Sequence, residues 1–393
     1  MKPQPSLRIR SFGGYAFAEV DKKVEELKSQ GVVPIDFGVG DPTIPTPPVV
    51  RRACQEAVDR HASSGYPSYV GSKEFREAVA AWNRRRFGVD LDPATEIAST
   101  IGSKEAIFHF SECYLDPGDV SIVPSPGYPP YKRGALFAEG ASHFVPIRRE
   151  NGFLPDLDRI PASVWQRAKI LWINYPNSPS GALAPDEFFE KAVALCRKHE
   201  VILASDEAYT EIYYGKPPRS ALEFGKENVV VFQSLSKRSA MTGYRIGWVA
   251  GDKDVVSVFK KIKTNIDSGT PNFVQAAAIA ALSDETHVRE MREEYRTKRD
   301  IMIRALTGLG LPDCTPDSTL YVWQKGPAGL TGIQFAERLL DPAVAIVVTP
   351  GEWISDDVDD KGTNPGAGHV RLALVPSVEE CHEAAKRLAK IRL

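Results

Sequence analysis

Short apolar runs alternate with helix-like stretches along most of the chain. Runs expected to form strands lie at 119–123, 170–173, 201–204, 229–232 and 248–250. Stretches with helical spacing lie at 15–30, 73–86, 106–114 and 186–199. This alternation predicts an α/β fold, in which a mostly parallel sheet has helices on both faces.

The last third of the chain has a different pattern. A long amphipathic stretch at 288–306 ends near two glycines that suit a helix C-cap. Strands are expected at 321–324, 345–348 and 370–374, and a closing helix at 378–390. We therefore expect a large domain over 41–285 and a smaller α+β domain over 286–393, preceded by a segment of about 40 residues.

Charge and composition exclude several classes of protein. The 49 basic and 51 acidic residues leave a net charge of −2, so phosphate neutralisation on nucleic acid is not expected. The five cysteines and seven histidines are scattered, which predicts neither disulfides nor a metal site. The most apolar helical run, 274–282, is too short to cross a bilayer, and the start lacks a signal-peptide pattern. We expect a soluble, cytoplasmic protein.

Polar clusters follow four of the expected strands directly. They lie at 124–128, 174–181, 205–209 and 233–237, and Gly243 to Gly247 come soon after the last of them. One such cluster is usually a turn, a helix cap or a solvated surface. Open α/β sheets bind ligands outside the carboxyl ends of their strands, so four clusters at one edge predict a binding site.

Pyridoxal 5′-phosphate (PLP) is the cofactor whose chemistry needs this set of residues. It requires a lysine for a Schiff base and a carboxylate to keep its ring nitrogen protonated, which Lys237 and Asp206 can supply. Asn177 and Tyr209 suit its phenolic oxygen. Its phosphate needs a helix N-terminus and an arginine. The candidates for the phosphate are Ser103, Lys104, Ser234, Ser236 and Arg245.

These motifs resemble those of the class I/II aminotransferases of fold type I, over nearly the whole chain. The matching pieces are Asn174-x-Pro176-Asn177-x-Pro179-x-Gly181, Asp206-Glu207-Ala208-Tyr209, Ser234-Leu235-Ser236-Lys237 and Gly243-x-Arg245-x-Gly247. The resemblance implies a large domain with a seven-stranded type of sheet and a ping-pong transfer between an amino acid and a 2-oxo acid. It further implies that Lys237, Asp206 and Tyr209 are catalytic.

The resemblance also implies roles for residues outside these motifs. Tyr128 would stack on the cofactor ring, and Arg371 would bind the substrate α-carboxylate, a role that suits the arginine fork. Tyr66 would reach the phosphate of the neighbouring subunit in a homodimer with shared sites. Residues 1–40 would pack with the small domain and with the partner subunit.

Finer features resemble the LL-diaminopimelate aminotransferases. Gly14-Tyr15-Ala16-Phe17 and Gly38-Val39-Gly40-Asp41 are similar to two of their substrate-side segments, and residues 264–269 fall where a partner segment lines their pocket. This resemblance implies lysine biosynthesis, with glutamate and 2-oxoglutarate as the second substrate pair. The residues it implies at the substrate are Tyr15, Gly40, Lys104, Tyr128, Asn177 and Arg371.

Other functions remain possible interpretations of the sequence. Alanine and aspartate aminotransferases share parts of these features, and the fold also carries PLP-dependent lyases and decarboxylases. A transcription regulator is disfavoured because no helix-turn-helix pattern precedes the first motif. Two departures from the family pattern are Ser180 in place of threonine and an acidic loop with Asp356, Asp357, Asp359 and Asp360. That loop is either a solvated insertion or an aid in selecting a substrate with a distal amino group.

Overall fold

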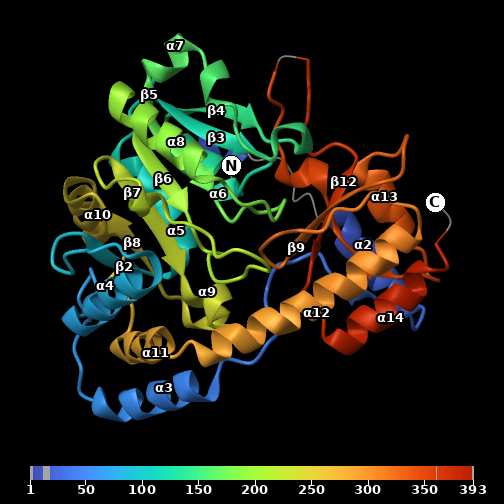
Figure 1. Cartoon of the computed structure of the whole chain (residues 1–393), viewed down its shortest axis with the longest axis horizontal. Helices are drawn as coiled ribbons and strands as arrows, with labels where there is room; N and C mark the ends of the chain where they lie inside the picture. The colour runs from blue at the N-terminus through green and yellow to red at the C-terminus, as the bar shows by residue number, and fades with distance from the viewer. Residues whose placement is uncertain (1–2, 12–17, 360, 392–393) are drawn as a thin grey trace.

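The chain folds into a larger and a smaller body joined by one long helix (Figure 1). The structure, a computed structural model, describes residues 3–11, 18–359 and 361–391. Across these residues, no helix has both the length and the apolar character that a membrane span requires.

A seven-stranded sheet forms the centre of the larger body. Its order is β2 (Ile97–Thr100), β8 (Gly247–Gly251), β7 (Val229–Ser234), β6 (Ile202–Asp206), β5 (Ala168–Asn174), β3 (Val120–Ser125) and β4 (Ala141–Pro146). Strand β8 is antiparallel to β2 and β7, whereas the other neighbours are parallel. The predicted fold class, with its mostly parallel sheet, is confirmed.

Helices cover both faces of this sheet. One core contains side chains of α3 (Pro48–Arg60), α4 (Lys73–Phe87), α8 (Asp186–His199) and α11 (Asn272–Ser283). The opposite core contains side chains of α5 (Gly102–Phe110), α6 (Pro129–Phe137) and α10 (Lys253–Ile266). Val229 and Val231 enter the first core while Val230 and Phe232 enter the second. Burial on both faces explains why the strands have nearly continuous apolar sequences.

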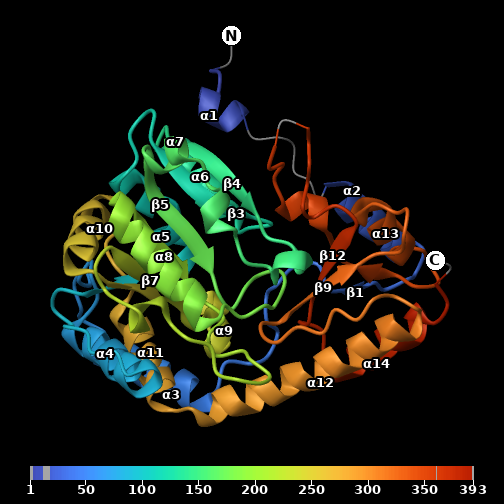
Figure 2. The ribbon, with the colours of Figure 1, turned by 45° about the horizontal axis from the view of Figure 1, so that its top comes forward.

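The smaller body has its own hydrophobic core. It contains side chains of the long helix α12 (Thr286–Gly308) from Met291 onward, of α13 (Gly332–Leu339) and α14 (Val378–Leu388), and of an antiparallel sheet. The order of that sheet is β11 (Thr349–Pro350), β12 (His369–Ala373) and β9 (Tyr321–Lys325). Helix α12 runs along one edge of the molecule and connects the two bodies (Figure 2).

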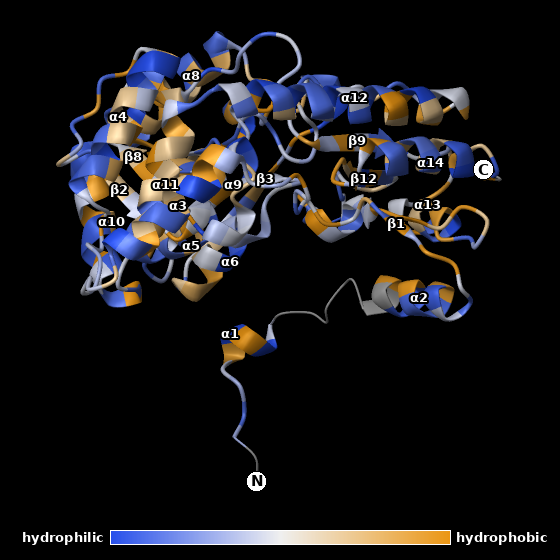
Figure 3. Cartoon of the chain, turned by 90° about the horizontal axis from the view of Figure 1, so that it is seen from below, coloured by the Kyte–Doolittle hydropathy of each residue, from blue (hydrophilic) through white to orange (hydrophobic). Residues whose placement is uncertain are grey.

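The N-terminal segment returns to the smaller body. Strand β1 (Ile35–Asp36) pairs in parallel with β10 (Ile346–Val347), and Phe37 is buried in the same core. Helix α2 (Ala18–Ser29) lies beside this body, whereas the short α1 (Leu7–Arg10) stands apart from the main mass (Figure 3). Leu7 and Ile9 of α1 are 76% and 48% exposed, so two apolar side chains face outward.

The pattern missed or merged several elements. It gave no element for α3, β2, β4, α6, α10 or α13, or for the short α7 (Ala162–Trp165). The single strand expected at 345–348 is instead β10, and it is followed at once by β11 in a different sheet. Of the helix expected at 15–30, residues 15–17 lie outside the described part of the chain.

Candidate active site

A cavity of about 600 Å³ lies at the carboxyl ends of the central strands, between the two bodies. Most of the residues that the sequence analysis singled out line it. These are Gly40, Ser103, Lys104, Tyr128, Asp206, Tyr209, Ser234, Ser236, Lys237, Arg245 and Arg371. The parallel register, which pairs Asn174 with Asp206, brings the strand ends level and gathers the clusters.

Of the candidates that the structure describes, two do not line this cavity. Asn177 is buried one residue from the lining residue Ser178, and its carboxamide oxygen accepts bonds from Ser180 N at 3.1 Å and Oγ at 2.6 Å. Tyr66 is 91% exposed and lies away from the cavity of its own chain. Tyr15 lies outside the described residues.

Lys237 is held at the end of β7 on the short helix α9 (Leu235–Arg238), which Ser234 caps. Its Nζ donates a hydrogen bond to the carbonyl oxygen of Gly40. Burial lowers the pKa of this amine, while Tyr321 and Asp41 partly oppose the shift. A lysine with a lowered pKa has more of the neutral amine that nucleophilic chemistry needs.

Asp206 is the last residue of β6 and is 4% exposed. Its Oδ2 accepts a hydrogen bond of 2.7 Å from the hydroxyl of Tyr131, and its Oδ1 accepts one of 3.3 Å from Ala208 N. Burial raises the pKa of this carboxyl to about 6. A cationic group beside it would favour the ionised form, so Asp206 suits a protonated ring nitrogen.

Arg245 and the N-terminus of α5 form an anion site at the other end of the cavity. Gly102, with φ +70°, begins α5, and a Cβ there would lie 2.4 Å from a terminal nitrogen of Arg245. Arg245 itself has φ 55° and donates to Thr242 O at 2.8 Å. The close approach places an exposed guanidinium beside free helix N–H groups, which suits the phosphate of PLP.

Arg371, on β12, faces the cavity from the smaller body. Its guanidinium donates to Gly38 O at 3.1 Å and lies 4.6 Å from the centre of the Tyr321 ring. Its buried Nε has no hydrogen-bond partner. An unpaired buried donor on an arginine is costly, and a substrate carboxylate would satisfy it.

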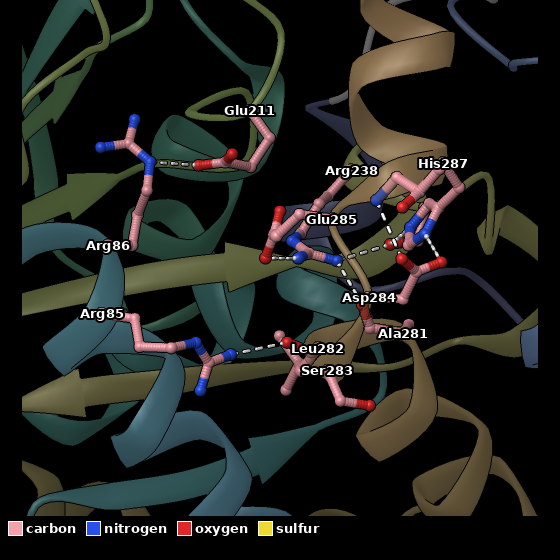
Figure 4. A network of polar contacts seen from close by, with 12 residues as sticks. Arg85, Arg86, Glu211, Arg238, Ala281, Leu282, Ser283, Asp284, Glu285 and His287 are labelled. Atoms are coloured by element: carbon pink, nitrogen blue, oxygen red, sulfur yellow. Dashed lines mark hydrogen bonds and ion pairs between the residues drawn. The ribbon is translucent and has the colours of Figure 1, made fainter.

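A buried network surrounds the guanidinium of Arg238, the residue that follows Lys237 in the chain. The guanidinium of Arg238 donates to Ala281 O at 2.7 Å and to Ser239 Oγ at 3.0 Å, and it pairs with Glu285 (Figure 4). Nearby, Arg86 pairs with Glu211 at 2.8 Å. Because Ala281 and Glu285 flank the junction of α11 and α12, Arg238 ties the lysine-bearing helix to the place where the chain crosses between the bodies.

The acidic loop reaches the larger body but not the cavity. Asp356 pairs with Lys132, and its backbone N and O both bond to Ser125 Oγ, at 2.8 and 2.7 Å. Asp357 and Asp359 are exposed, and of the loop's described residues none lines the cavity. The loop therefore joins the two bodies near Tyr128, and its described aspartates, Asp356, Asp357 and Asp359, supply no carboxylate to the cavity wall.

The sequence analysis missed four polar residues of this site: Asp41, Tyr131, Thr242 and Tyr321. Tyr131 follows Tyr128 by three residues, a helical spacing that could have indicated it. Asp41 is the last residue of the recognised segment Gly38-Val39-Gly40-Asp41 but was given no role, and Thr242 directly precedes the motif that begins at Gly243. Tyr321 had no local signal, because its contacts with Tyr209 and Gly40 depend on how distant segments pack.

Comparisons with known proteins show which family the chain belongs to. The family model for aminotransferase class I and II matches residues 32–388. LL-diaminopimelate aminotransferase of Aquifex aeolicus is 45% identical over 390 residues, covering 98% of each chain. The protein of the same name from Nitratidesulfovibrio vulgaris is 43% identical, again over 98% of each chain.

Solved structures share the fold over nearly the full length. Substrate-bound BacF from Bacillus subtilis has a TM-score of 0.91 at 33% identity, covering 99% of this chain and 98% of the other. Aspartate aminotransferase from Thermus thermophilus with maleate has a TM-score of 0.89 at 32% identity, covering both chains completely. The chain belongs to the class I and II aminotransferase family, and it is a PLP-dependent aminotransferase.

Proposed function

We propose that this enzyme is LL-diaminopimelate:2-oxoglutarate aminotransferase, acting in lysine biosynthesis. The relatives that support the proposal carry the name LL-diaminopimelate aminotransferase and are 43–45% identical over nearly the full chain. The single observation that carries the chemistry is the meeting of Lys237, Asp206 and Arg371 in one cavity.

The residues present fit the cofactor. PLP, when bound, supplies an electron sink that stabilises negative charge at the substrate Cα. Lys237 would hold it covalently, and the Asp206 carboxylate would keep a proton on its ring nitrogen. Tyr209 would contact its phenolic oxygen, and Arg245 with the α5 N-terminus would hold its phosphate. Each charge-assisted hydrogen bond of this kind contributes about 1.5–3 kcal/mol.

Lys237 would also move the proton. With its amine free, Nζ of Lys237 would accept the proton from the substrate Cα and hold it for return, while the bound cofactor would stabilise the negative charge left at Cα. The lowered pKa of Lys237 favours this role, because the neutral amine is the form that accepts a proton.

Arg371 would orient the substrate. A fork that binds the α-carboxylate fixes the amino group toward Lys237, and the unpaired Nε supports this assignment. Holding the carboxylate also disfavours its loss as carbon dioxide, so decarboxylation is the least favoured alternative. Lys104, exposed at the cavity mouth, is the candidate for a second, distal carboxylate.

The substrate assignment is tested with the purified holoenzyme and single amino acids. Loss of the visible absorbance of bound PLP is recorded after adding LL-diaminopimelate, meso-diaminopimelate, glutamate, alanine or aspartate. We expect LL-diaminopimelate and glutamate to remove it and the Lys237→Ala enzyme to show no response. A response to alanine or aspartate alone would favour the alanine/aspartate type and refute the narrower substrate.

We further propose a cytoplasmic homodimer, with domains at 41–285 and 286–393 and residues 1–40 packing on the smaller domain and on the partner. The 91% exposure of Tyr66 and the outward apolar side chains of α1 support a partner surface. Ile35 and Phe37 share the core of the smaller body, which supports the packing of the N-terminal segment. The free cysteines suit a reducing compartment.

A further inference from the structure

Tyr321 is a buried residue of the cavity wall to which the sequence analysis gave no role. It lies at the start of β9, is 4% exposed and lines the cavity. It comes from the smaller body, yet it touches residues from three other parts of the chain.

Its hydroxyl and its ring have separate contacts. The hydroxyl oxygen lies 3.2 Å from the hydroxyl oxygen of Tyr209, which belongs to the larger body. The Arg371 guanidinium lies over the Tyr321 ring, 4.6 Å from the centre of that ring. A cation held over an aromatic face is stabilised more as it loses contact with water, and Arg371 is half-buried.

The Tyr321 side chain packs closely against Gly40. A Cβ on Gly40 would lie 2.0 Å from the Tyr321 hydroxyl oxygen and 2.7 Å from its Cζ. Gly40 does not have a positive φ, so its backbone would accept alanine, and the three atoms nearest to the added Cβ all belong to Tyr321. The Gly40 carbonyl also accepts the bond from Lys237, so Tyr321 packs against the segment that holds the lysine.

We propose that Tyr321 is a positioning residue of the aminotransferase site. Its ring positions the Arg371 guanidinium, and its hydroxyl positions the hydroxyl of Tyr209. The inference rests on the proposed function, in which Arg371 binds the substrate carboxylate and Tyr209 contacts the cofactor. Tyr321 thereby fixes the distance between the carboxylate end and the reacting end of the substrate.

Two substitutions separate the ring from the hydroxyl. Tyr321→Phe keeps the ring under Arg371, whereas Tyr321→Leu removes both. The probe is glutarate, a dicarboxylate without an amino or oxo group, and calorimetry measures its binding to the holoenzyme. We expect Tyr321→Leu to weaken glutarate binding about tenfold, because the cation loses its aromatic support. Tyr321→Phe should leave glutarate binding unchanged and lower kcat about tenfold with little change in KM.

Tyr114 provides the matched control. It is half-buried in the larger body, and its hydroxyl donates to Val255 O at 3.2 Å, away from the cavity. Tyr114→Phe and Tyr114→Leu should leave glutarate binding and the ratio of kcat to KM as in wild type.

A double-mutant cycle tests the fit at Gly40. Gly40→Ala alone should weaken glutarate binding, since the new methyl displaces Tyr321, and it should add little in the Tyr321→Leu background. Additive effects, or Tyr321 variants that match the Tyr114 controls, would overturn the proposal. A wild-type enzyme that binds glutarate but ignores LL-diaminopimelate would instead refute the proposed substrate and leave this inference standing.

Discussion

At the scale of single residues, the site depends on charges that the fold buries. Glu207, next to Asp206, is fully buried, and its Oε1 accepts from Ser205 Oγ, Ser220 Oγ and Ala221 N at 2.9–3.1 Å. Burial nevertheless raises the pKa of this carboxyl to about 7. Glu207 lies outside the cavity, so it anchors the loop after β6 rather than taking part in the chemistry.

From the raised pKa of Glu207 we predict how the free energy of unfolding depends on pH. The unfolded chain releases the Glu207 proton near pH 4.5, whereas the folded state keeps it until about pH 7. The stability of the fold with a protonated Glu207 is therefore fully present at low pH and is lost as pH rises towards 7. The difference in unfolding free energy between wild type and Glu207→Gln should fall by about 3 kcal/mol across that window. Urea unfolding of the apoprotein at a series of pH values measures it.

The exposed Glu290 gives the control for this titration. Glu290→Gln should leave the pH profile of unfolding parallel to that of wild type. A Glu207→Gln profile that is also parallel would show that the buried carboxyl is ionised throughout, and the prediction would be wrong.

At the scale of elements, the acidic loop acts as a link between the two bodies. Residues 353–356, here called the clasp, include the end of the 3₁₀ turn Gly351–Ile354 and lie against the end of β3. Gly127 N donates to Ile354 O at 3.1 Å, and Ser125 Oγ both accepts from and donates to the Asp356 backbone. The Lys132–Asp356 pair is partly exposed and contributes less than these buried bonds.

Removing one hydroxyl should release the clasp. Ser125→Ala loses both bonds to Asp356, which costs about 1–2 kcal/mol of local stability. Amide hydrogen exchange in residues 351–366 should become roughly tenfold faster as the segment opens more often. Mass spectrometry of the exchanged protein, after peptic digestion, provides the rates.

Ser121 lies on the same strand, and its buried Oγ has no hydrogen-bond partner. Ser121→Ala should therefore leave exchange in 351–366 unchanged. Equal exchange in the Ser125 and Ser121 variants would contradict the clasp.

The elements differ in how far the sequence could predict them. Strands β5, β6 and β7 were predictable because both faces are buried and each contains an uninterrupted apolar run. The edge strand β4 exposes or half-exposes five of its six residues, so its pattern resembles a loop. Helices α3 and α6 begin with prolines. The first turn of a helix accepts proline, but proline elsewhere interrupts a helix, so the sequence pattern indicated a loop at these positions.

The same contrast holds within the site. Lys237, Asp206 and Arg245 were predictable because each belongs to a short motif at a strand end. Tyr321 was not, because its position reflects the packing of the smaller body against Gly40 and Tyr209. Local patterns specify residues that one element carries, whereas contacts between distant segments require the folded structure.

At the scale of the whole molecule, the proposed homodimer completes each active site with a residue of the second subunit. Tyr66 is exposed on its own chain, and the family resemblance assigns it to the phosphate of the neighbour. Consider a mixed dimer in which one subunit carries Lys237→Ala and the other carries Tyr66→Ala. With this arrangement both substitutions fall in the same active site. The other site of that dimer then has both residues intact.

Subunit complementation tests this arrangement. After the two inactive variants are mixed and allowed to exchange subunits, activity should return to roughly a quarter of wild type, since half the dimers are mixed and each has one working site. The same variants kept separate serve as the control. A mixture no more active than its components would contradict the shared site.

The account as a whole depends on a covalent bond between Lys237 and the cofactor. The most direct measurement is reduction of the purified holoenzyme with borohydride, followed by mass spectrometry of its peptides. The account predicts a pyridoxyl group fixed to the peptide that contains Lys237, and none in the Lys237→Ala protein. A pyridoxyl group on another lysine, or on no peptide at all, would contradict it.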